Sequence, residues 1–579
     1  MKMKLINSNI KILGLVALFI SSITSCKQEE ELSINPSGVR PNIAFVGLTN
    51  TNATTSPAGQ LIRYNANNVN QVVGAAVNIT GVQTGESIIA IDYRPATGML
   101  YGISNQSRLY ILNPLNGNSR AVNSTPFAPA LPTTAGIVAG FDFDPTLDII
   151  RLITKTGQNY RLNPNDGSIL ATDGAINGVS DAVLAEAAYT NNLNGSTTTE
   201  LYNLDLINAR LYKQVPNTGV LTTVGSLGVR PITINTNSAF STAYNNNITN
   251  FRNSALAGFD IAPTGEALAV FTNLNGAAPA IPVGGISAGP PANPSSAVNA
   301  VSGNPTLFQI DLVTGKTIDL GVIPFPAPNN ALAATALIGI AIAPAPVGYA
   351  IDDANNNLLI FNLTKPEPVS KTITGLQASE TIVGLDFRPL NGQLYGLGSS
   401  SRIYVINPAT GVATAVGVLP LVPLLSGTSF GFDFIPNADL IRIVSNTGQN
   451  LRVNPTTGLV SNIDATINGS NSVTFSATAY NNNLVPSTNP VFFLMNTATD
   501  SLYRINDAAN GRVTRVGKLN VTADAANGFD VSAVSNTAYA ILTKGTETRI
   551  YTINTSLGSA APGLIFPRKV RAFTVGLGF

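Results

Sequence analysis

The chain repeats itself, and the repeats limit the folds that are open to it. The segment GFDFDPTLDIIRLITKTGQNYRLNP (residues 140–164) returns as GFDFIPNADLIRIVSNTGQNLRVNP (residues 431–455). Likewise, IIAIDYRPATGMLYGISNQSRLYILNPLNG (residues 88–117) returns as IVGLDFRPLNGQLYGLGSSSRIYVINPATG (residues 382–411). Agreement over most of the two halves indicates gene duplication and predicts two domains. The predicted domains are residues 42–345 and residues 346–579.

A shorter unit recurs inside each half. It consists of a small residue, an aspartate between apolar residues, a turn, and three further short strands separated by Gly, Pro and Asn. Strands at a period of about 40 to 50 residues are typical of four-stranded β-propeller blades. We therefore predict an all-β fold of two consecutive β-propeller-like domains, with about five four-stranded blades each. One ten-bladed ring built from the same strands is the alternative.

The ends of each half suggest how its ring closes. The first half opens with NIAFVGLT (residues 42–49), which looks like the second strand of a blade, and LIGIAIAP (residues 337–344) can supply the missing inner strand. VGYAID (residues 347–352) and VRAFTVGLGF (residues 570–579) form the corresponding pair in the second half. Such closure removes an open sheet edge. A Gly/Ala/Pro-rich insertion in the fifth blade, residues 272–305, has no counterpart and is expected to be an exposed loop.

The composition of the 579 residues excludes several classes of function. With 11% charged and 44% hydrophobic residues, the chain can bury a core and is not a disordered polymer. It contains no histidine, which removes the commonest general base and the usual zinc and haem ligand. The formal net charge is only +1 and no Lys/Arg cluster is visible, so nucleic acid is not an expected partner.

The amino-terminal segment predicts export and a lipid anchor. Three lysines precede the apolar run ILGLVALFI (residues 12–20), which is too short to span a bilayer as a helix and suits a signal peptide over residues 1–25. The following Ile-Thr-Ser-Cys resembles the bacterial lipobox and implies lipidation of Cys26, the only cysteine. A lone thiol beside an ordinary cleavage site is the alternative. Acyl chains on Cys26 would anchor the protein to a membrane without spanning it.

Residues 26–41 are expected to form a flexible tether between the anchor and the first domain. The tether begins with KQEEE (residues 27–31), which is similar to the surface-export signal of Bacteroidetes lipoproteins. The resemblance implies an outer-membrane lipoprotein of the bacterial cell envelope that is exposed at the cell surface. A solvated spacer is the alternative interpretation of the acidic run.

Three groups of residues carry a family resemblance. The strings LDFRPLNGQLYGL, SSSRIYVINPATG and GFDF followed by IR and TGQN resemble those of a bacterial domain of unknown function, number 4394. The resemblance is present twice and covers nearly everything after residue 41. It implies a propeller-like fold and an extracytoplasmic setting, and it brings no established activity.

An aspartate recurs in the first strand of most repeat units, and it has two interpretations. The preferred one is a structural clasp, in which the carboxylate beside a small residue accepts hydrogen bonds from a nearby turn. The other is a ring of carboxylates around each channel that holds Ca²⁺ or another hard cation. No calcium-loop motif occurs, and we expect no cofactor. The residues concerned are Asp92, Asp142, Asp260, Asp386, Asp433 and Asp530.

Arginines are duplicated in the same way. They can pair with the aspartate series between blades, or they can point into a pocket that captures a carboxylate or sulfate. The structural pairing is preferred. The duplicated pairs are Arg94 and Arg388, Arg151 and Arg442, and Arg161 and Arg452.

Two further sets of polar residues are candidates for carbohydrate chemistry. Asp144 and Asp148 could form a carboxylate pair for glycoside hydrolysis, but the second half has Ile435 in place of Asp144. Tyrosines could replace the tryptophan platforms of sugar-binding propellers, although flanking apolar residues make core packing the default. These tyrosines are Tyr101, Tyr110, Tyr395 and Tyr404.

The sequence thus favours a non-catalytic, surface-anchored lipoprotein that binds a glycan or an envelope or extracellular protein. Recognition is expected in what differs between the halves, namely the insertion at residues 272–305 and the unequal loops at residues 126–135 and 419–427. A carboxylate- or metal-dependent hydrolase or lyase on the same scaffold is the alternative.

Overall fold

The structure is a computed structural model that describes residues 40–49, 56–131, 138–229, 255–273, 305–324, 336–505, 507–524 and 527–579. The predicted leader, Cys26, nearly all of the tether and all but the ends of the 272–305 insertion lie outside these ranges. Within them, no helix has the length and apolar character needed to cross a membrane.

The described residues form ten four-stranded antiparallel sheets, five in each half. In the first half the sheets, each given from its inner to its outer strand, are β20 (Leu337–Ile342), β1 (Ala44–Thr49), β2 (Gln60–Asn65) and β3 (Val77–Asn78); β4 (Ile88–Tyr93), β5 (Leu100–Ser104), β6 (Leu109–Leu112) and β7 (Ser119–Ala121); β8 (Val138–Asp144), β9 (Ile149–Thr154), β10 (Asn159–Leu162) and β11 (Ile169–Thr172); β12 (Leu184–Tyr189), β13 (Leu201–Asp205), β14 (Arg210–Gln214) and β15 (Leu221–Ser226); and β16 (Ala255–Ile261), β17 (Ala267–Asn273), β18 (Thr306–Ile310) and β19 (Thr317–Val322).

The second half is built in the same way. Its sheets are β40 (Val570–Val575), β21 (Val347–Asp352), β22 (Leu358–Asn362) and β23 (Lys365–Lys371); β24 (Ile382–Phe387), β25 (Leu394–Gly398), β26 (Arg402–Ile406) and β27 (Ala413–Ala415); β28 (Phe430–Ile435), β29 (Leu440–Ser445), β30 (Asn450–Val453) and β31 (Val460–Ile463); β32 (Phe475–Tyr480), β33 (Phe492–Asn496), β34 (Ser501–Ile505) and β35 (Thr514–Lys518); and β36 (Gly528–Val531), β37 (Ala538–Lys544), β38 (Glu547–Ile553) and β39 (Ala560–Phe566).

Helical structure is almost absent from the described residues. It is limited there to two short 3₁₀ helices, η1 (Ala66–Asn68) and η3 (Ala508–Asn510). The predicted all-β class is therefore confirmed.

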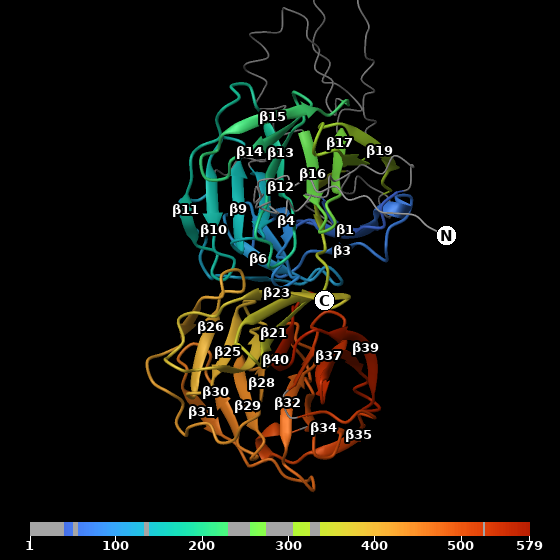
Figure 1. The fold of residues 1–579 in the computed structure, drawn as a ribbon. Coiled ribbons are helices and arrows are strands. Elements are labelled where there is room, and N and C mark those ends of the chain that lie inside the picture. Colours follow the sequence, from blue (N-terminus) through green and yellow to red (C-terminus); the bar gives the residue numbers. More distant parts are fainter. Residues whose placement is uncertain are drawn as a thin grey trace, which may run out of the picture.

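The sheets form two closed rings rather than one. In the first half the inner strands contact one another in the cyclic order β20, β4, β8, β12, β16 and back to β20. In the second half the order is β40, β24, β28, β32, β36 and back to β40. Figure 1 shows the two rings one above the other, the first in blue to green and the second in yellow to red. We call them ring 1 and ring 2; the ten-bladed alternative is wrong.

Each ring closes through a blade whose strands come from both ends of its half. Strand β1 pairs with β2 and with β20, and Gly47 lies opposite Ile340. Strand β21 pairs with β22 and with β40, and Ala350 lies opposite Phe573. The sequence prediction of closure is confirmed in both rings.

Glycine in the inner strands allows neighbouring blades to approach closely. A Cβ atom added to Gly140 of β8 would lie 2.5 Å from the Cβ of Ala187 in β12. A Cβ atom on Gly384 of β24 would lie 2.5 Å from the Cβ of Phe432 in β28. Each of these glycines precedes an aspartate of the recurring series by two residues. The small residue is therefore needed for the packing of inner strands, not to make room for a turn.

The two rings share apolar core. One cluster of buried side chains includes Met99 and Tyr101 of ring 1 together with Tyr349 and Leu577 of ring 2. The Tyr349 hydroxyl donates to the carbonyl oxygen of Ala96 at 2.6 Å, across the boundary between the rings. The two rings are thus packed directly against each other.

Candidate functional site

The six recurring aspartates gather into two triads on the inner strands, one in each ring. In each triad one carboxylate oxygen from each residue lies within 4.8 Å of the other two, and all six residues are buried. Strands β4, β8 and β16 supply the first triad and strands β24, β28 and β36 supply the second. The triads are Asp92, Asp142 and Asp260 in ring 1, and Asp386, Asp433 and Asp530 in ring 2.

Every aspartate of the first triad accepts a hydrogen bond from the inner strand of the next blade. Asp92 accepts from the amide of Phe143 at 2.8 Å, and Asp142 accepts from the amide of Tyr189 at 3.1 Å. Asp260 completes the set at 2.5 Å from the amide of Ile342. The clasp interpretation is thus confirmed, with one correction: the donor is the adjacent inner strand and not a nearby turn.

Ring 2 repeats these bonds at equivalent positions. The amides of Phe434, Tyr480 and Val575 donate to Asp386, Asp433 and Asp530 at 2.8, 3.1 and 2.7 Å. Inner strands have no ladder partner on the channel side, so a carboxylate from the preceding blade gives their amides an acceptor that they would otherwise lack.

Burial makes these carboxyls weak acids. It raises the pKa of Asp260 to about 7 and that of Asp530 to about 6, because the charged form loses its hydration. The pKa of Asp92 and that of Asp386 also lie well above the ordinary value, through burial and the neighbouring carboxyls. The carboxyls of each triad are therefore protonated more readily than an exposed aspartate, because burial and the neighbouring carboxyls both raise the pKa.

The triads fit a hard cation in part. Carboxylate oxygen is the donor that Ca²⁺ prefers, but Ca²⁺ takes about six to eight oxygens, more than three side chains supply. Both oxygens of Asp92 and of Asp260 already accept amide hydrogens. Asp142, Asp433 and the other members thus act first as hydrogen-bond acceptors for the fold.

The two triads differ in the group beside them. In ring 2 the Thr574 hydroxyl lies within hydrogen-bonding distance of both Asp386 (3.1 Å) and Asp530 (2.7 Å). Ala341 occupies this place in ring 1. Ring 1 instead has a fourth buried acid, Glu186, whose pKa is raised well above its usual value by burial. Sequence reasoning missed both residues because neither is repeated in the other half.

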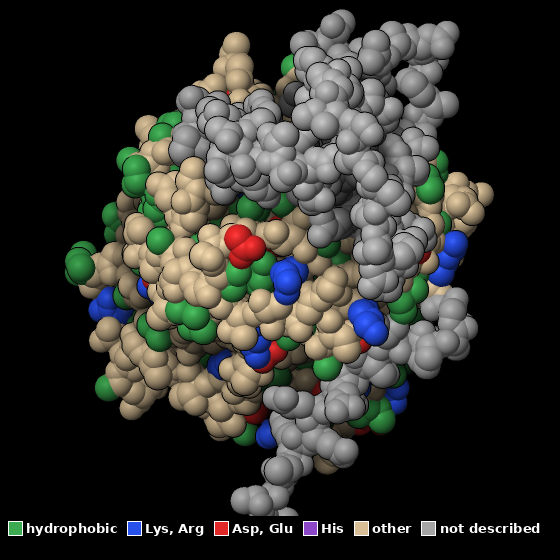
Figure 2. Space-filling model, turned by 90° about the horizontal axis from the view of Figure 1, so that it is seen from above, with side chains coloured by type: hydrophobic (Ala, Val, Ile, Leu, Met, Phe, Trp, Pro, Cys, Tyr) green, Lys and Arg blue, Asp and Glu red, His purple; other side chains and the backbone are tan. Residues whose placement is uncertain are grey.

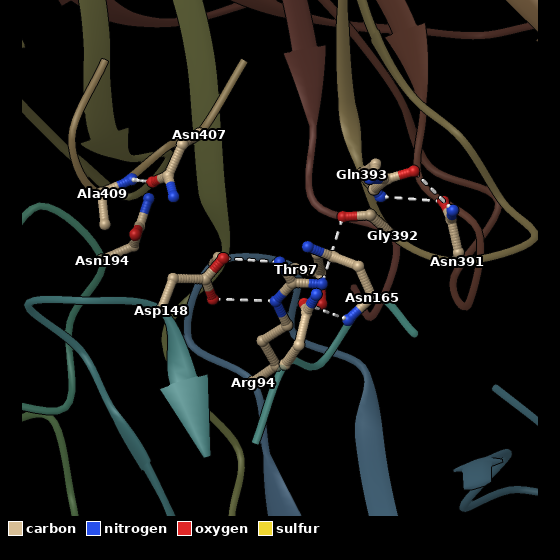
Figure 3. A network of polar contacts seen from close by, with 12 residues as sticks. Arg94, Thr97, Asp148, Asn165, Asn194, Asn391, Gly392, Gln393, Asn407 and Ala409 are labelled. Atoms are coloured by element: carbon tan, nitrogen blue, oxygen red, sulfur yellow. Dashed lines mark hydrogen bonds and ion pairs between the residues drawn. The ribbon is translucent and has the colours of Figure 1, made fainter. Parts of the chain in front are cut away.

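The duplicated arginines bind aspartates, but not those of the triads. Arg94 pairs with Asp148 at 2.5 Å, and its Nε donates to the same carboxylate at 2.8 Å. Figure 3 shows this double contact and the reach of Arg94 to the carbonyl oxygen of Gly392 in ring 2, 3.3 Å away. Arg388 pairs with Asp439 at 2.5 Å in the same position of ring 2.

The remaining arginines form two equivalent forks around one carboxylate each. Arg151 and Arg161 both bind Asp173, at 2.6 and 2.8 Å. In ring 2, Arg442 and Arg452 both bind Asp464, at 2.9 and 2.8 Å. The structural-pairing interpretation is correct in kind, and the predicted partners, the triad aspartates, are wrong. The alternation of residues along a strand predicts on which face of the sheet a side chain lies. Which acidic residue it pairs with depends on the path of the connecting loops.

The carbohydrate-chemistry residues are also bound within the fold. Asp144 accepts from the amide and hydroxyl of Thr146 at 2.8 and 2.6 Å, and Asp148 is held by Arg94. The four tyrosines are buried, as core packing predicts. Tyr110 donates to Glu86 at 2.6 Å, and Tyr404 donates to Glu380. The equivalence of these two glutamates could have been found from the repeat, since each lies two residues before a predicted strand.

A cavity of about 140 Å³ lies between the rings. Asn113, Asn116 and Arg120 line it from ring 1, and Asn483 and Leu484 line it from ring 2. The Arg120 guanidinium donates to the carbonyl oxygens of Pro389, at 2.6 Å, and Leu390. None of the arginines proposed from the sequence as pocket residues, Arg94, Arg151, Arg388 and Arg442, lines this cavity. Arg120 was missed because Thr414 takes its place in the second half.

These features define a class of protein: a tandem of five-bladed propellers whose repeated charged residues tie blade to blade. The chain belongs to the family described as Domain of unknown function (DUF4394), whose family model matches residues 60–333 and 357–573. The family therefore occurs twice. A search of curated proteins finds no match.

Several solved structures are similar to this chain. A nidogen/laminin complex matches 40% of this chain and 98% of its own, with 10% identity and a TM-score of 0.27. A structural genomics protein of unknown function from Bacteroides thetaiotaomicron matches 46% and 72%, with 15% identity and a TM-score of 0.27. The extracellular domain of a hybrid two component system from B. thetaiotaomicron matches 92% and 79%, with 10% identity and a TM-score of 0.23.

Proposed function

We propose that this chain is a non-catalytic binding or scaffold lipoprotein of the bacterial outer membrane, exposed at the cell surface and anchored through Cys26. One observation carries the proposal. The charged residues that recur in both rings are bound to partners inside the fold, as shown by the Asp260 clasp and the Arg94–Asp148 pair. Repetition of these residues is explained by folding, so recognition falls to loops and surfaces that differ between the rings.

The outer surface supports binding without charge steering. Figure 2 shows one face on which uncharged side chains and backbone predominate, with single basic and acidic side chains scattered among them. The cavity between the rings adds asparagine amides and Arg120 beside apolar side chains such as Leu484. Amide and guanidinium groups beside an apolar wall suit the hydroxyls and ring faces of a sugar, and we therefore propose a glycan as the first ligand to test.

A glycan array of bacterial and plant polysaccharides, probed with the unlipidated chain, tests this function. The expected result is binding that Arg120→Met weakens at least tenfold, while the matched surface variant Lys213→Met, remote from the cavity lining, leaves it unchanged. Capture of an envelope protein in place of any glycan would assign the scaffold role instead. Release of shortened saccharides by the wild type, and not by Asp260→Asn, would overturn the non-catalytic proposal in favour of a carboxylate- or metal-dependent hydrolase or lyase.

The anchor is tested separately in cells. We expect labelled palmitate to enter the wild-type chain and not Cys26→Ala, and we expect the variant to leave the membrane fraction. Protease added to intact cells should degrade the anchored chain if it faces outward. Membrane association that survives Cys26→Ala without label would contradict lipidation at this residue.

A further inference from the structure

The loop between β27 and β28 carries large aliphatic side chains that point into solvent. Val418 is 86% exposed, Leu419 62%, Val422 77% and Leu424 61%. Residues 417–427 read GVLPLVPLLSG and contain no aromatic, charged or amide side chain. Four large apolar side chains in so short a segment are an exposed apolar patch of the kind that marks an interaction site.

The loop is held in place from behind. The amide of Leu421, a buried residue, donates to the carbonyl oxygen of Ser401 at 2.7 Å. The amide of Leu425 donates to the Ser401 hydroxyl at 2.9 Å. These two anchors fix the backbone on either side of Val422 and Leu424, whose exposed side chains are thus presented in a defined arrangement.

Some backbone groups of the loop are bonded to neighbouring side chains, and two amide donors are absent. Arg402 donates to the carbonyl oxygen of Val418 at 3.0 Å, and the Gln449 side chain donates to that of Leu424 at 2.9 Å. Pro420 and Pro423 have no amide hydrogen. The two prolines reduce the number of amide donors that would lose their water in an apolar medium.

Ring 1 contains the same loop with different side chains. The amides of Phe127 and Leu131 donate to Ser107 just as those of Leu421 and Leu425 donate to Ser401. This correspondence places Ser124, Thr125, Ala128 and Ala130 at the positions of Val418, Leu419, Val422 and Leu424. The scaffold of the loop does not require large apolar side chains at these positions, so ring 2 has them for a separate reason.

We propose that the loop at residues 417–427 inserts into the surface of a lipid bilayer. Protein interfaces depend on aromatic and arginine anchors within a polar rim, and this loop offers neither. Aliphatic side chains on a fixed, uncharged loop are suited to the hydrocarbon beneath the lipid headgroups, because hydrocarbon neither donates nor accepts hydrogen bonds. The insertion deepens the proposed membrane anchoring, because it gives ring 2 a contact with the bilayer of its own.

Vesicle flotation tests the contact without the acyl anchor. The chain that begins at Lys27 is mixed with vesicles of phosphatidylethanolamine and phosphatidylglycerol, and the fraction that floats is measured. We expect flotation of the wild type. We expect at least a tenfold lower bound fraction for the variant Val418→Ser/Leu419→Thr/Val422→Ala/Leu424→Ala, which copies the ring 1 loop and should keep the same unfolding midpoint.

A tryptophan probe locates the insertion. The chain has no tryptophan, so Leu419→Trp gives a single fluorophore in ring 2 and Thr125→Trp gives its matched control in ring 1. Brominated lipids should quench the first and not the second. Equal quenching of both, no flotation of the wild type, or self-association that the fourfold variant abolishes would each overturn the inference. None of these outcomes bears on palmitate labelling of Cys26, so failure here is distinct from failure of the proposed anchoring.

Discussion

At the scale of single residues, the pair of glycine and aspartate two positions apart explains why the inner strands recur so faithfully. Gly431 lets β28 approach β32, and Asp433 then accepts the amide of Tyr480 from that neighbour. Neither residue works alone, since a larger residue at Gly431 would separate the strands and lengthen the hydrogen bond. Buried amides without acceptors cost about 1–3 kcal/mol each, which is enough to preserve the pair in the five of the ten blades that contain it.

Stability should fall as pH rises from about 4 to about 7. The pKa values of Asp260 and Asp530 rise from an ordinary 3.8 to about 7 and about 6 in the folded protein. Between these limits the folded state binds more protons than the unfolded state, so the free energy of unfolding decreases with increasing pH. Urea denaturation at pH 4.5, 6 and 7.5 measures this, and Asp260→Asn, which mimics the protonated form, should reduce the slope.

The same titration separates protons from metal. If the triads work by sharing protons, 5 mM CaCl₂ at pH 7.5 leaves the unfolding midpoint unchanged. A rise of several degrees that EDTA reverses, and that Asp92→Asn removes, would contradict proton sharing and assign a cation to ring 1.

Thr574→Ala should destabilise ring 2 by about 1–3 kcal/mol. The substitution removes the hydroxyl beside Asp386 and Asp530, and leaves buried carboxyls with one partner fewer. Thr574→Ser keeps the hydroxyl and is the matched control. Equal free energies of unfolding for the alanine variant and the wild type, measured in urea, would show that the hydroxyl adds nothing to the clasp.

At the scale of strands and turns, equivalent positions of the two rings are natural controls for each other. Arg94 and Asp148 are almost fully buried, with exposed side-chain fractions of 1% and 5%, whereas the Asp439 side chain in ring 2 is 35% exposed. Both rings have the same arginine–aspartate ion pair, but the two pairs differ in burial. Ring 2 covers the Arg94–Asp148 pair of ring 1.

Arg94→Met should therefore cost far more than Arg388→Met. Loss of Arg94 leaves the buried Asp148 carboxylate without its ion-pair partner and lowers the free energy of unfolding by about 3–5 kcal/mol. Loss of Arg388 leaves the partly hydrated Asp439, at a cost of about 1 kcal/mol or less. Denaturant midpoints of the two variants decide the matter, and equal losses would mean that burial between the rings does not matter here.

Much of the element-level structure could be predicted from the sequence, and the reasons are physical. Turn residues at regular spacing and alternating apolar residues determine strands. The sequence therefore predicts the blades, and it predicts that β20 and β40 close the two rings. Partners across loops were not: Arg151 meets Asp173 because of the way β11 leads into its following loop, which no alternation encodes. Arg120 and Thr574 each act in one ring only, so a comparison of the two repeats does not identify them.

At the scale of the whole molecule, the shared core makes the rings a single unit. Met99 and Tyr101 pack in one cluster with residues of ring 2, and Arg120 and Tyr349 bond across the boundary. The 140 Å³ cavity lies at this same boundary. The position of the cavity depends on how the two complete rings pack against each other. The repeated sequence of a single half does not predict that packing.

Calorimetry should show one unfolding transition for the wild type. Met99→Glu places a charge in the apolar contact between the rings and should split the transition into two, since burial of an unpaired charge opposes docking. Met99→Leu conserves volume and should preserve the single transition. Two transitions in the wild type would show that the rings unfold independently despite their contact.

The closing blades also set an order of events for a chain delivered from its amino terminus. The strand that lies innermost in the first blade of ring 1, β20, is the last of that half to arrive, and β40 holds the same position for ring 2. Until β20 arrives, β1 presents a bare edge to whatever strand is nearby. Completion of each ring is therefore a late, long-range event, and the consequence is slow folding during which the open strand edges need shielding.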